Sequence, residues 1–255
     1  MPEFMQKIHK ISFIGYGLVG QTLASYLQSK GLEICQIVVR KMPVLPLKNV
    51  AFISNIGDLK PVDLVLICVN DDALFKIIEQ IPSSQLTAYT SGSIGLKELG
   101  NHEKIAVFYP LQSFAHLRRE AVPFIPILLE AQSEVVFETL KSFALQYFQD
   151  CRAMNSESRA KLHLAAVFAN NFTNHIIYLA QKHCEQNNLP FDLLKPLIAE
   201  TAQKWLHFDA CDLQTGPAIR GDEKVIQKHL SQLSDDMQSI YETLTNSIQK
   251  NKHSK

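Results

Sequence analysis

The fold of this chain is decided by residues 11–29, which read ISFIGYGLVGQTLASYLQS. The first four residues form a short apolar run typical of a buried strand, and from Leu18 onward apolar residues recur at helical spacing. The turn between them reads Gly15-Tyr-Gly17-Leu-Val-Gly20, a GxGxxG pattern. A GxGxxG pattern between a strand and a helix is typical of the first turn of a Rossmann fold, which binds the pyrophosphate of a dinucleotide.

The three glycines of this turn have separate expected roles. Gly15 allows the tight turn, Gly17 lets the backbone approach the pyrophosphate, and Gly20 lets the helix pack closely on the strand. The alternative is a glycine turn in a parallel fold that binds nothing. The candidate cofactor residues of the loop are Gly15, Tyr16, Gly17, Leu18, Val19 and Gly20.

The first half of the chain alternates short apolar runs with helical patterns, which predicts an α/β domain with a mostly parallel sheet. The expected strands are 11–14, 34–39, 50–53, 64–69, 86–90, 105–108 and 125–129, and the expected helices are 18–29, 72–80 and 133–148. We place this Rossmann domain at residues 1–154.

The second half reads as an all-α domain, residues 155–255. Residues 157–186 contain neither Gly nor Pro and predict one long helix. Two further helices are expected at 192–208 and 222–249, the second with Asp222 as its N-cap. No strand is expected after residue 155.

Charge and hydropathy exclude several classes of function. The 25 basic residues balance 25 acidic ones, so no overall field attracts nucleic acid or an anionic membrane. Apolar stretches such as 62–69 are shorter than the roughly 20 residues of a membrane-spanning helix, and residues 1–10 lack the apolar core of a signal peptide. We therefore expect a soluble cytoplasmic protein that binds neither nucleic acid nor membrane.

The cysteines and histidines give no metal motif. No cysteine belongs to a CxxC pair, and no histidine stands at zinc-ligand spacing, so no metal is expected. We interpret the thiols as reduced and mostly buried, and the alternative is that one of them is catalytic. They are Cys35, Cys68, Cys151, Cys184 and Cys211.

The strand expected at 34–39 is followed by Arg40-Lys41, where an NAD-binding domain usually carries an acid for the ribose hydroxyls. A charge-assisted hydrogen bond to the 2′-phosphate of NADP contributes about 1.5–3 kcal/mol. One such bond corresponds to a preference of roughly ten- to a hundredfold. NADP is therefore favoured over NAD, and the alternative is a solvated pair of cations.

Further motifs follow in order: ICVNDDAL at 67–74, YTSGS at 89–93, FYPLQSF at 108–114, RAKLHLAAVFANN at 159–171 and GPAIRGD at 216–222. With them the chain resembles the NADP oxidoreductases that join a Rossmann domain to a helical domain similar to the C-terminal part of 6-phosphogluconate dehydrogenase. Relatives of that family include pyrroline-5-carboxylate reductase, ketopantoate reductase and the deazaflavin-dependent NADP reductases.

The resemblance implies further cofactor residues at the ends of two strands. Val69, Asn70 and Asp71 would line the cofactor groove, and Ser91 would lie near the nicotinamide. The alternative is that the Asn-Asp-Asp segment caps a helix and the Ser-Gly segment makes a turn.

The family usually reads His-Pro-Leu-Gln where this chain reads Tyr109-Pro-Leu-Gln112. Tyr109 has an ordinary pKa near 10 and would be a weaker acid near pH 7 than the family histidine. Tyr109 is therefore a candidate proton donor or a residue that positions the substrate, and Gln112 is a candidate substrate contact.

The remaining polar candidates lie in the helical half. His163, Asn170 and Asn171 follow or border one stripe of the long helix and form either a site or a structural network. We assign His163 and Asn171 as candidate catalytic residues and Asn170 as a candidate substrate contact. Arg220 could clamp a carboxylate or phosphate of the substrate, or pair with a local acid.

These features predict an NADP(H)-dependent oxidoreductase that acts on a small carbonyl, hydroxyl or imine compound between its two domains. A homodimer through the helical domain is expected. The alternative is a non-catalytic dinucleotide-binding sensor or scaffold, and a purely structural α/β protein is the third interpretation.

Overall fold

The computed structural model describes residues 7–100, 102–116 and 118–251. The chain forms two compact units that divide between Asn171 and Phe172. The functional boundary expected at residue 154 stays a prediction.

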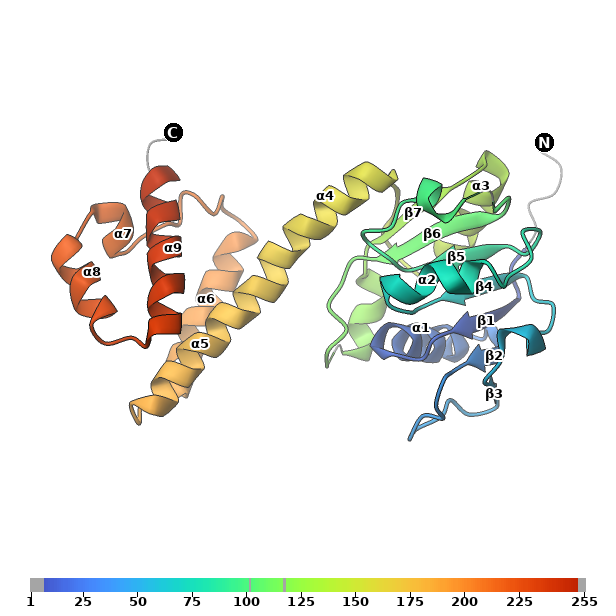
Figure 1. The fold of residues 1–255 in the computed structure, drawn as a ribbon, viewed down its shortest axis with the longest axis horizontal. Coiled ribbons are helices and arrows are strands. Elements are labelled where there is room, and N and C mark those ends of the chain that lie inside the picture. Colours follow the sequence, from blue (N-terminus) through green and yellow to red (C-terminus); the bar gives the residue numbers. More distant parts are fainter. Residues whose placement is uncertain (1–6, 101, 117, 252–255) are drawn as a thin grey trace. The chain divides into compact units, whose positions relative to one another are not determined.

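The first unit is built on an eight-stranded sheet with the order β3-β2-β1-β4-β5-β6-β7-β8 (Figure 1). All neighbouring strands are parallel except β6 and β7. The order reverses between β1 and β4, which creates the kind of crevice where open α/β sheets bind ligands. The strands are β1 Lys10–Ile14, β2 Glu33–Val38, β3 Ala51–Ile53, β4 Leu64–Ile67, β5 Thr87–Tyr89, β6 Ile105–Pro110, β7 Ile127–Ala131 and β8 Cys151–Ala153.

The seven expected strands are present, with ends that differ by a few residues, and β8 is an addition. β8 has three residues at the edge of the sheet and carries the exposed Arg152. Such a short polar segment lacks the apolar run by which a strand is recognised.

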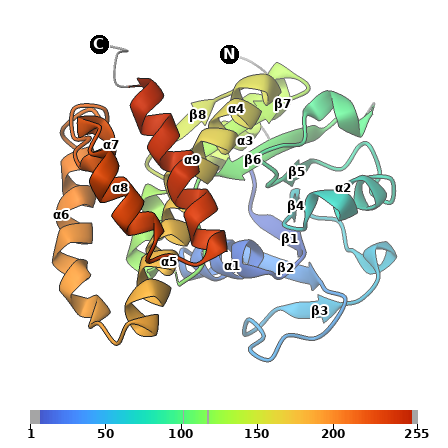
Figure 2. The same ribbon diagram turned by 60° about the vertical axis from the view of Figure 1, so that its left-hand side comes forward.

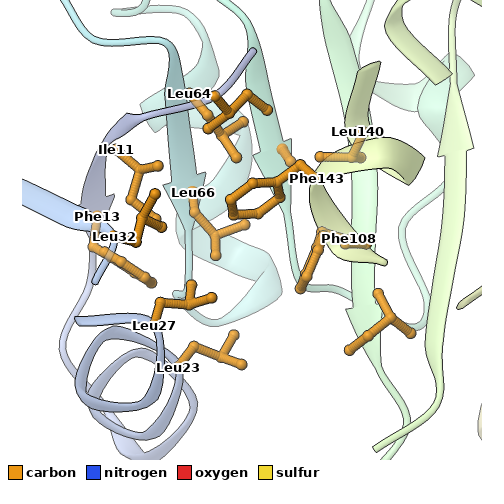
Figure 3. Close-up of a cluster of buried hydrophobic side chains, with 14 of the residues drawn as sticks. Ile11, Phe13, Leu23, Leu27, Leu32, Leu64, Leu66, Phe108, Leu140 and Phe143 are labelled. Carbon is orange, nitrogen blue, oxygen red and sulfur yellow. The ribbon is translucent and has the colours of Figure 1, made fainter. Parts of the chain in front are cut away.

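Helices cover both faces of the sheet. Helix α1 Leu18–Ser29 and α3 Glu134–Ala144 pack on one face, and α2 Asp71–Ile78 packs on the other. Figure 3 shows the first of these cores, where Leu23 and Leu27 of α1 meet the strand residues Phe13 and Leu66. Each fully buried side chain of this kind contributes about 1.5–3 kcal/mol. Short 3₁₀ turns complete the unit at Ile56–Asp58, Leu96–Leu99 and Arg119–Phe124.

The long helix expected at 157–186 is confirmed as a continuous helical segment, with one irregularity. It consists of α4 Ser156–Ala166, a π-helix at Val167–Phe172 and α5 Thr173–Gln186. The side chain of Asn155 caps the start, because its Oδ1 accepts the N–H of Ser158 at 2.8 Å. In a π-helix each backbone hydrogen bond joins residues five positions apart instead of four. This irregularity lies in the segment where the two units divide.

The second unit contains helices and turns and, among its described residues, no strand. After α5 come a 3₁₀ turn at Phe191–Leu194 and the helices α6 Lys195–Trp205, α7 Pro217–Arg220, α8 Glu223–Leu230 and α9 Asp235–Asn251. Helix α7 contacts both α8 and α9 (Figure 2).

The prediction of one helix over 222–249 is wrong, because the segment breaks between Leu230 and Asp235. The side-chain amide of Gln238 donates to the carbonyl oxygens of Leu230 and Leu233, at 3.0 Å each. These bonds tie α9 to the end of α8 and to the segment that joins the two helices. Asp235 and Asp236 begin α9 at its positive end. The segment 192–208 likewise begins as a 3₁₀ turn rather than as α-helix.

Within the described ranges, no helix is both long and apolar enough to cross a bilayer.

Candidate active site

The first unit contains a cavity of about 1340 Å³ at the carboxyl edge of the sheet. Its lining comes from residues near the ends of β1, β2, β4, β5 and β6, from residues that follow β3, from α1 and α2, and from one residue of α4. This edge includes the crevice where the strand order reverses. The volume exceeds the roughly 300–1,000 Å³ typical of pockets for small ligands, so the cavity suits an extended molecule.

The glycine loop lines this cavity, and steric contacts explain two of its three glycines. Gly15 has a φ of +97°, and a Cβ there would lie 2.3 Å from the carbonyl oxygen of Cys68. A Cβ on Gly20 would lie 2.5 Å from the carbonyl oxygen of Gly15. At Gly17 a Cβ would meet nothing within 4 Å. Gly15 and Gly20 are therefore required for packing, whereas Gly17 leaves open space.

The open space at Gly17 fits the pyrophosphate of a dinucleotide. Gly17 is the N-cap of α1 and, as a glycine, has no side chain that could bind the first N–H groups of the helix. The first N–H groups of a helix have no partner within it, and they lie at its positive end. Tyr16, Leu18 and Val19 also line the cavity, so the backbone around Gly17 borders the ligand space. Gly20 does not line the cavity, because it packs behind the loop.

The two cations expected to select NADP also line the cavity. Arg40 and Lys41 follow β2 and are both exposed, and among the described residues neither forms an ion pair. Val44 and Leu45 line the same region and are 96% and 83% exposed. This part of the lining therefore combines two cations that form no ion pair among the described residues with two exposed apolar side chains.

The polar residues after β4 and β5 line the cavity as the sequence suggested, and they also form local structure. Asn70 is the N-cap of α2 but makes no side-chain cap bond. The carboxylate of Asp71 accepts a hydrogen bond from Ser93 Oγ. Ser91 Oγ accepts the N–H of Ile94 at 3.0 Å. Asp71 and Ser91 therefore take part both in local structure and in the cavity lining, and Val69 also lines the cavity.

Tyr109 and His163 meet at the cavity wall. Tyr109 is the last residue but one of β6, His163 lies on α4, and Tyr109 Oη is 2.8 Å from His163 Nδ1. Burial raises the pKa of Tyr109, and the nearby charge of Arg159 opposes that shift. Both side chains line the cavity, so a polar pair with an exchangeable proton faces the ligand space.

Gly92 lies in close contact with this pair. A Cβ at Gly92 would lie 2.7 Å from His163 Nδ1 and 2.9 Å from Tyr109 Cζ. Such distances are too short for any side chain to fit without moving the pair. The YTSGS motif thus matters for packing as well as for its hydroxyl groups.

The described structure does not bring the other candidates to this cavity. Gln112 turns back to accept the N–H of Ser113 at 2.8 Å and is not among the lining residues. Asn170 and Asn171 are exposed on the π-helix and do not line the cavity either. Their roles stay predictions.

Arg220 belongs to the second unit and forms a local ion pair. Its Nε and Nη2 both lie 2.9 Å from Asp222 Oδ2. Asp222 is the N-cap of α8 but makes no side-chain cap bond, because its carboxylate faces Arg220 instead. The role of Arg220 toward a substrate stays a prediction.

The thiols are unpaired, and burial differs among them. Cys68 and Cys184 are buried, Cys35 and Cys151 are half-buried, and Cys211 is exposed. Burial raises the pKa of the Cys68 thiol to about 12, so it stays protonated near neutral pH. Among the described residues, no cluster of three or more His, Cys, Asp or Glu side chains could hold a metal ion.

Sequence reasoning missed Arg159, a fully buried arginine of α4. Its Nη1 bonds the carboxylate of Glu130 on β7, and its Nη2 donates to the carbonyl oxygen of Ile94 at 2.6 Å. The signal that could have drawn attention to it is its position, four residues before His163 and on the same face of the helix.

The fold and the cavity define a class, the Rossmann-type proteins with a dinucleotide-binding loop. Residues 125–248 match a family model described as "Domain of unknown function (DUF2520)". No curated protein matches the chain.

Solved structures give a more specific result. A protein of Bacteroides fragilis described as a "putative NADP oxidoreductase" is 34% identical, with a TM-score of 0.85 over 97% of this chain and 100% of that one. The chain belongs to the family of this protein, a family of Rossmann-type oxidoreductases.

More distant structures share the fold. The pyrroline carboxylate reductase of Plasmodium falciparum, solved with NADP bound, is 12% identical, with a TM-score of 0.61 over 96% of this chain and 97% of that one. The imine reductase of Streptomyces aurantiacus is also 12% identical, with a TM-score of 0.66 over 95% of this chain and 94% of that one.

Proposed function

We propose that this chain is an NADP(H)-dependent oxidoreductase of a small carbonyl, hydroxyl or imine compound. One observation carries the proposal: a single cavity is lined both by the glycine loop and by the hydrogen-bonded pair Tyr109–His163. The loop supplies a site for the cofactor pyrophosphate, and the pair supplies a proton beside the ligand space. That the substrate binds between the two domains stays a prediction.

The preference for NADP rests on Arg40 and Lys41. Both line the cavity, and neither is neutralised by an ion pair within the described residues. A free guanidinium can form the charge-assisted hydrogen bonds that a 2′-phosphate accepts. The Plasmodium neighbour, which shares the fold, was solved with NADP.

The bound cofactor would supply or accept a hydride at the substrate carbon. In the direction of reduction, Tyr109 Oη donates its proton to the substrate oxygen or nitrogen. A protonated His163 then replaces that proton through Nδ1, which lies 2.8 Å from Oη. This relay matters because a buried tyrosine with a raised pKa is a weak acid near neutral pH. In the direction of oxidation the same protons move the opposite way.

We also propose that the chain forms a homodimer through its second unit. Large apolar side chains remain exposed there in the single chain, among them Leu193, Leu197, Trp205, Leu206 and Phe208. Large exposed apolar patches mark interaction surfaces. Light scattering coupled to gel filtration tests this directly: a mass near 28.8 kDa, that of one chain, would contradict it.

The cofactor proposal is tested by thermal unfolding with and without NADPH, followed by assays of NADPH oxidation against keto acids, aldehydes and cyclic imines. A ligand that binds only the folded state raises the melting temperature. Failure of millimolar NADPH to raise it would contradict the proposal.

A second function has one observation in its favour. Burial raises the pKa of Tyr109, which disfavours proton transfer from the tyrosine alone. Such a site would suit a dinucleotide-binding sensor or scaffold. Tight binding of NADPH without oxidation across the substrate panel would favour this function.

A further inference from the structure

The first unit contains an ionic cluster, built on the buried Arg159 and the half-buried Glu130, that neither the cofactor loop nor the proton relay includes. Arg159 is fully buried, and its Nη1 bonds the carboxylate of Glu130. Ser156 joins the cluster, because its Oγ donates to Glu130 Oε2 at 2.7 Å. Arg159 and Ser156 begin α4, whereas Glu130 belongs to β7. The cluster therefore ties the start of α4 to the sheet.

The same cluster fixes the loop that carries Gly92. Arg159 Nη2 donates to the carbonyl oxygen of Ile94 at 2.6 Å, and Ser156 Oγ accepts the N–H of Leu96 at 3.1 Å. The N–H of Ile94 in turn donates to Ser91 Oγ at 3.0 Å. Two residues of α4 thus bind the backbone at the end of the 91–94 turn and just after it.

His163 follows Arg159 by four residues and lies on the same face of α4. It contacts Tyr109 and the surface of Gly92 at the other end of this arrangement. A shift of α4 along the sheet would therefore change the distance between His163 and Tyr109, and a movement of the loop toward the cavity would displace the pair.

Stability alone explains Arg159 poorly. A buried ion pair is often no more stabilising than apolar residues of similar volume. Moreover, Arg159 Nε has no hydrogen-bond partner among the described residues. An unpaired buried donor costs free energy, which offsets part of what the ion pair contributes.

We propose that Arg159 is a positioning residue: by bonding Glu130 and the carbonyl oxygen of Ile94 at once, it holds α4 and the 91–96 loop so that His163 stays within hydrogen-bond distance of Tyr109. The inference deepens the proposed function, since it concerns the residue pair that would move the proton. The geometry itself does not depend on turnover.

The test uses NMR to monitor the Tyr109–His163 hydrogen bond through the imidazole ¹⁵N signals of His163. These signals are assigned by comparison with His163→Gln, in which they are absent. The bonded nitrogen and the tautomer determine these signals. Tyr109→Phe removes the bond and gives the reference spectrum. Two variants probe Arg159. The double variant Arg159→Gln with Glu130→Gln removes both charges and keeps hydrogen-bonding groups, and Arg159→Lys keeps a cation against Glu130 but not the fork that reaches two acceptors.

In both variants the His163 signals should shift toward those of Tyr109→Phe. Arg152→Gln is the matched control, because Arg152 pairs with Asp150 at the exposed edge of the same unit, and its spectrum should equal that of the wild type. If either folded Arg159 variant retains the wild-type His163 signals, the proposal is wrong. NADPH binding is measured separately. A wild-type protein that fails to bind NADPH would overturn the proposed function and leave the spectroscopic result readable.

Discussion

Gly15 and Gly17 lie two residues apart in one loop, yet the structure predicts opposite consequences for the same substitution. In Gly15→Ala the new Cβ would lie 2.3 Å from the carbonyl oxygen of Cys68 and 2.9 Å from Val69 Cγ1, at a φ of +97°. Backbone strain of this kind costs about 1–3 kcal/mol, and overpacking adds about 1–3 kcal/mol. The sum, roughly 2–6 kcal/mol, is a large part of the 5–15 kcal/mol by which domains are stable. Gly15→Ala should therefore be strongly destabilised.

In Gly17→Ala the Cβ meets no protein atom within 4 Å, and the backbone is already extended at a φ of −72°. The fold should therefore survive, whereas a Cβ in the phosphate space should weaken NADPH binding. With NADPH at a hundred times the wild-type Kd, binding stabilises the wild type by about 2.7 kcal/mol. A hundredfold loss of affinity would reduce this gain to about 0.4 kcal/mol.

Urea unfolding of both variants, with and without NADPH, measures the two effects separately. Gly15→Ala with wild-type stability would refute the steric argument. Gly17→Ala that folds and keeps the full NADPH-dependent stabilisation would refute the placement of the pyrophosphate. Gly57→Ala is a suitable control, because its Cβ would make only ordinary contacts with Asn55, the nearest at 3.5 Å.

Three further substitutions test the rest of the site. Arg40→Asp should weaken NADPH binding by roughly ten- to a hundredfold and leave NADH binding intact, as measured by fluorescence titration, because one charge-assisted bond is lost; an unchanged preference would contradict the role of Arg40. Tyr109→Phe should lower turnover by about 10²–10⁴-fold at unchanged NADPH affinity, because the proton donor is removed, and steady-state kinetics with undiminished kcat would exclude the relay. Burial raises the pKa of Cys68 from 9.0 to about 12, so the unfolded chain releases this proton first and stability falls as pH rises from 9 toward 12. The difference in unfolding free energy between wild type and Cys68→Ala should therefore change by about 1.4 kcal/mol per pH unit in that range; a difference independent of pH would show that the thiol is not desolvated.

The cofactor half of the site could be predicted from the sequence, because its chemistry depends on local backbone geometry. Gly15 and Gly20 must lack a Cβ, since their neighbours are the strand end and the loop itself. Arg40 follows a strand at the position where the pattern places the ribose. Features set by a few consecutive residues leave a readable pattern.

The sequence indicated Tyr109 and His163 as separate candidates, but it did not predict that they form a pair. Tyr109 and His163 are 54 positions apart, and their contact depends on how α4 crosses the sheet. Arg159 and Glu130 are 29 positions apart, and Arg159 stands in a segment that reads as an ordinary polar first turn. No periodicity reports such contacts, because they arise from tertiary packing.

The break between α8 and α9 illustrates the same limit within the helical half. Residues 231–234 read SQLS, without Gly or Pro. Gln238, which lies beyond the break, donates its side-chain amide to the carbonyl oxygens of Leu230 and Leu233. Rules that search for helix breakers examine the residues at the boundary, so they do not detect a contact made by a residue of the following helix.

The spacing between Arg159 and His163 links the ionic cluster to the cavity through one turn of α4. Each residue of an α-helix turns the next side chain by about 100°, so inserting a single residue between them would rotate His163 away from Tyr109 while leaving every side chain of the site in the sequence. The number of residues in this turn is thus as constrained as their identity. Among related chains, a gap placed between these two positions should distinguish proteins that retain the pair from proteins that have only the dinucleotide-binding loop.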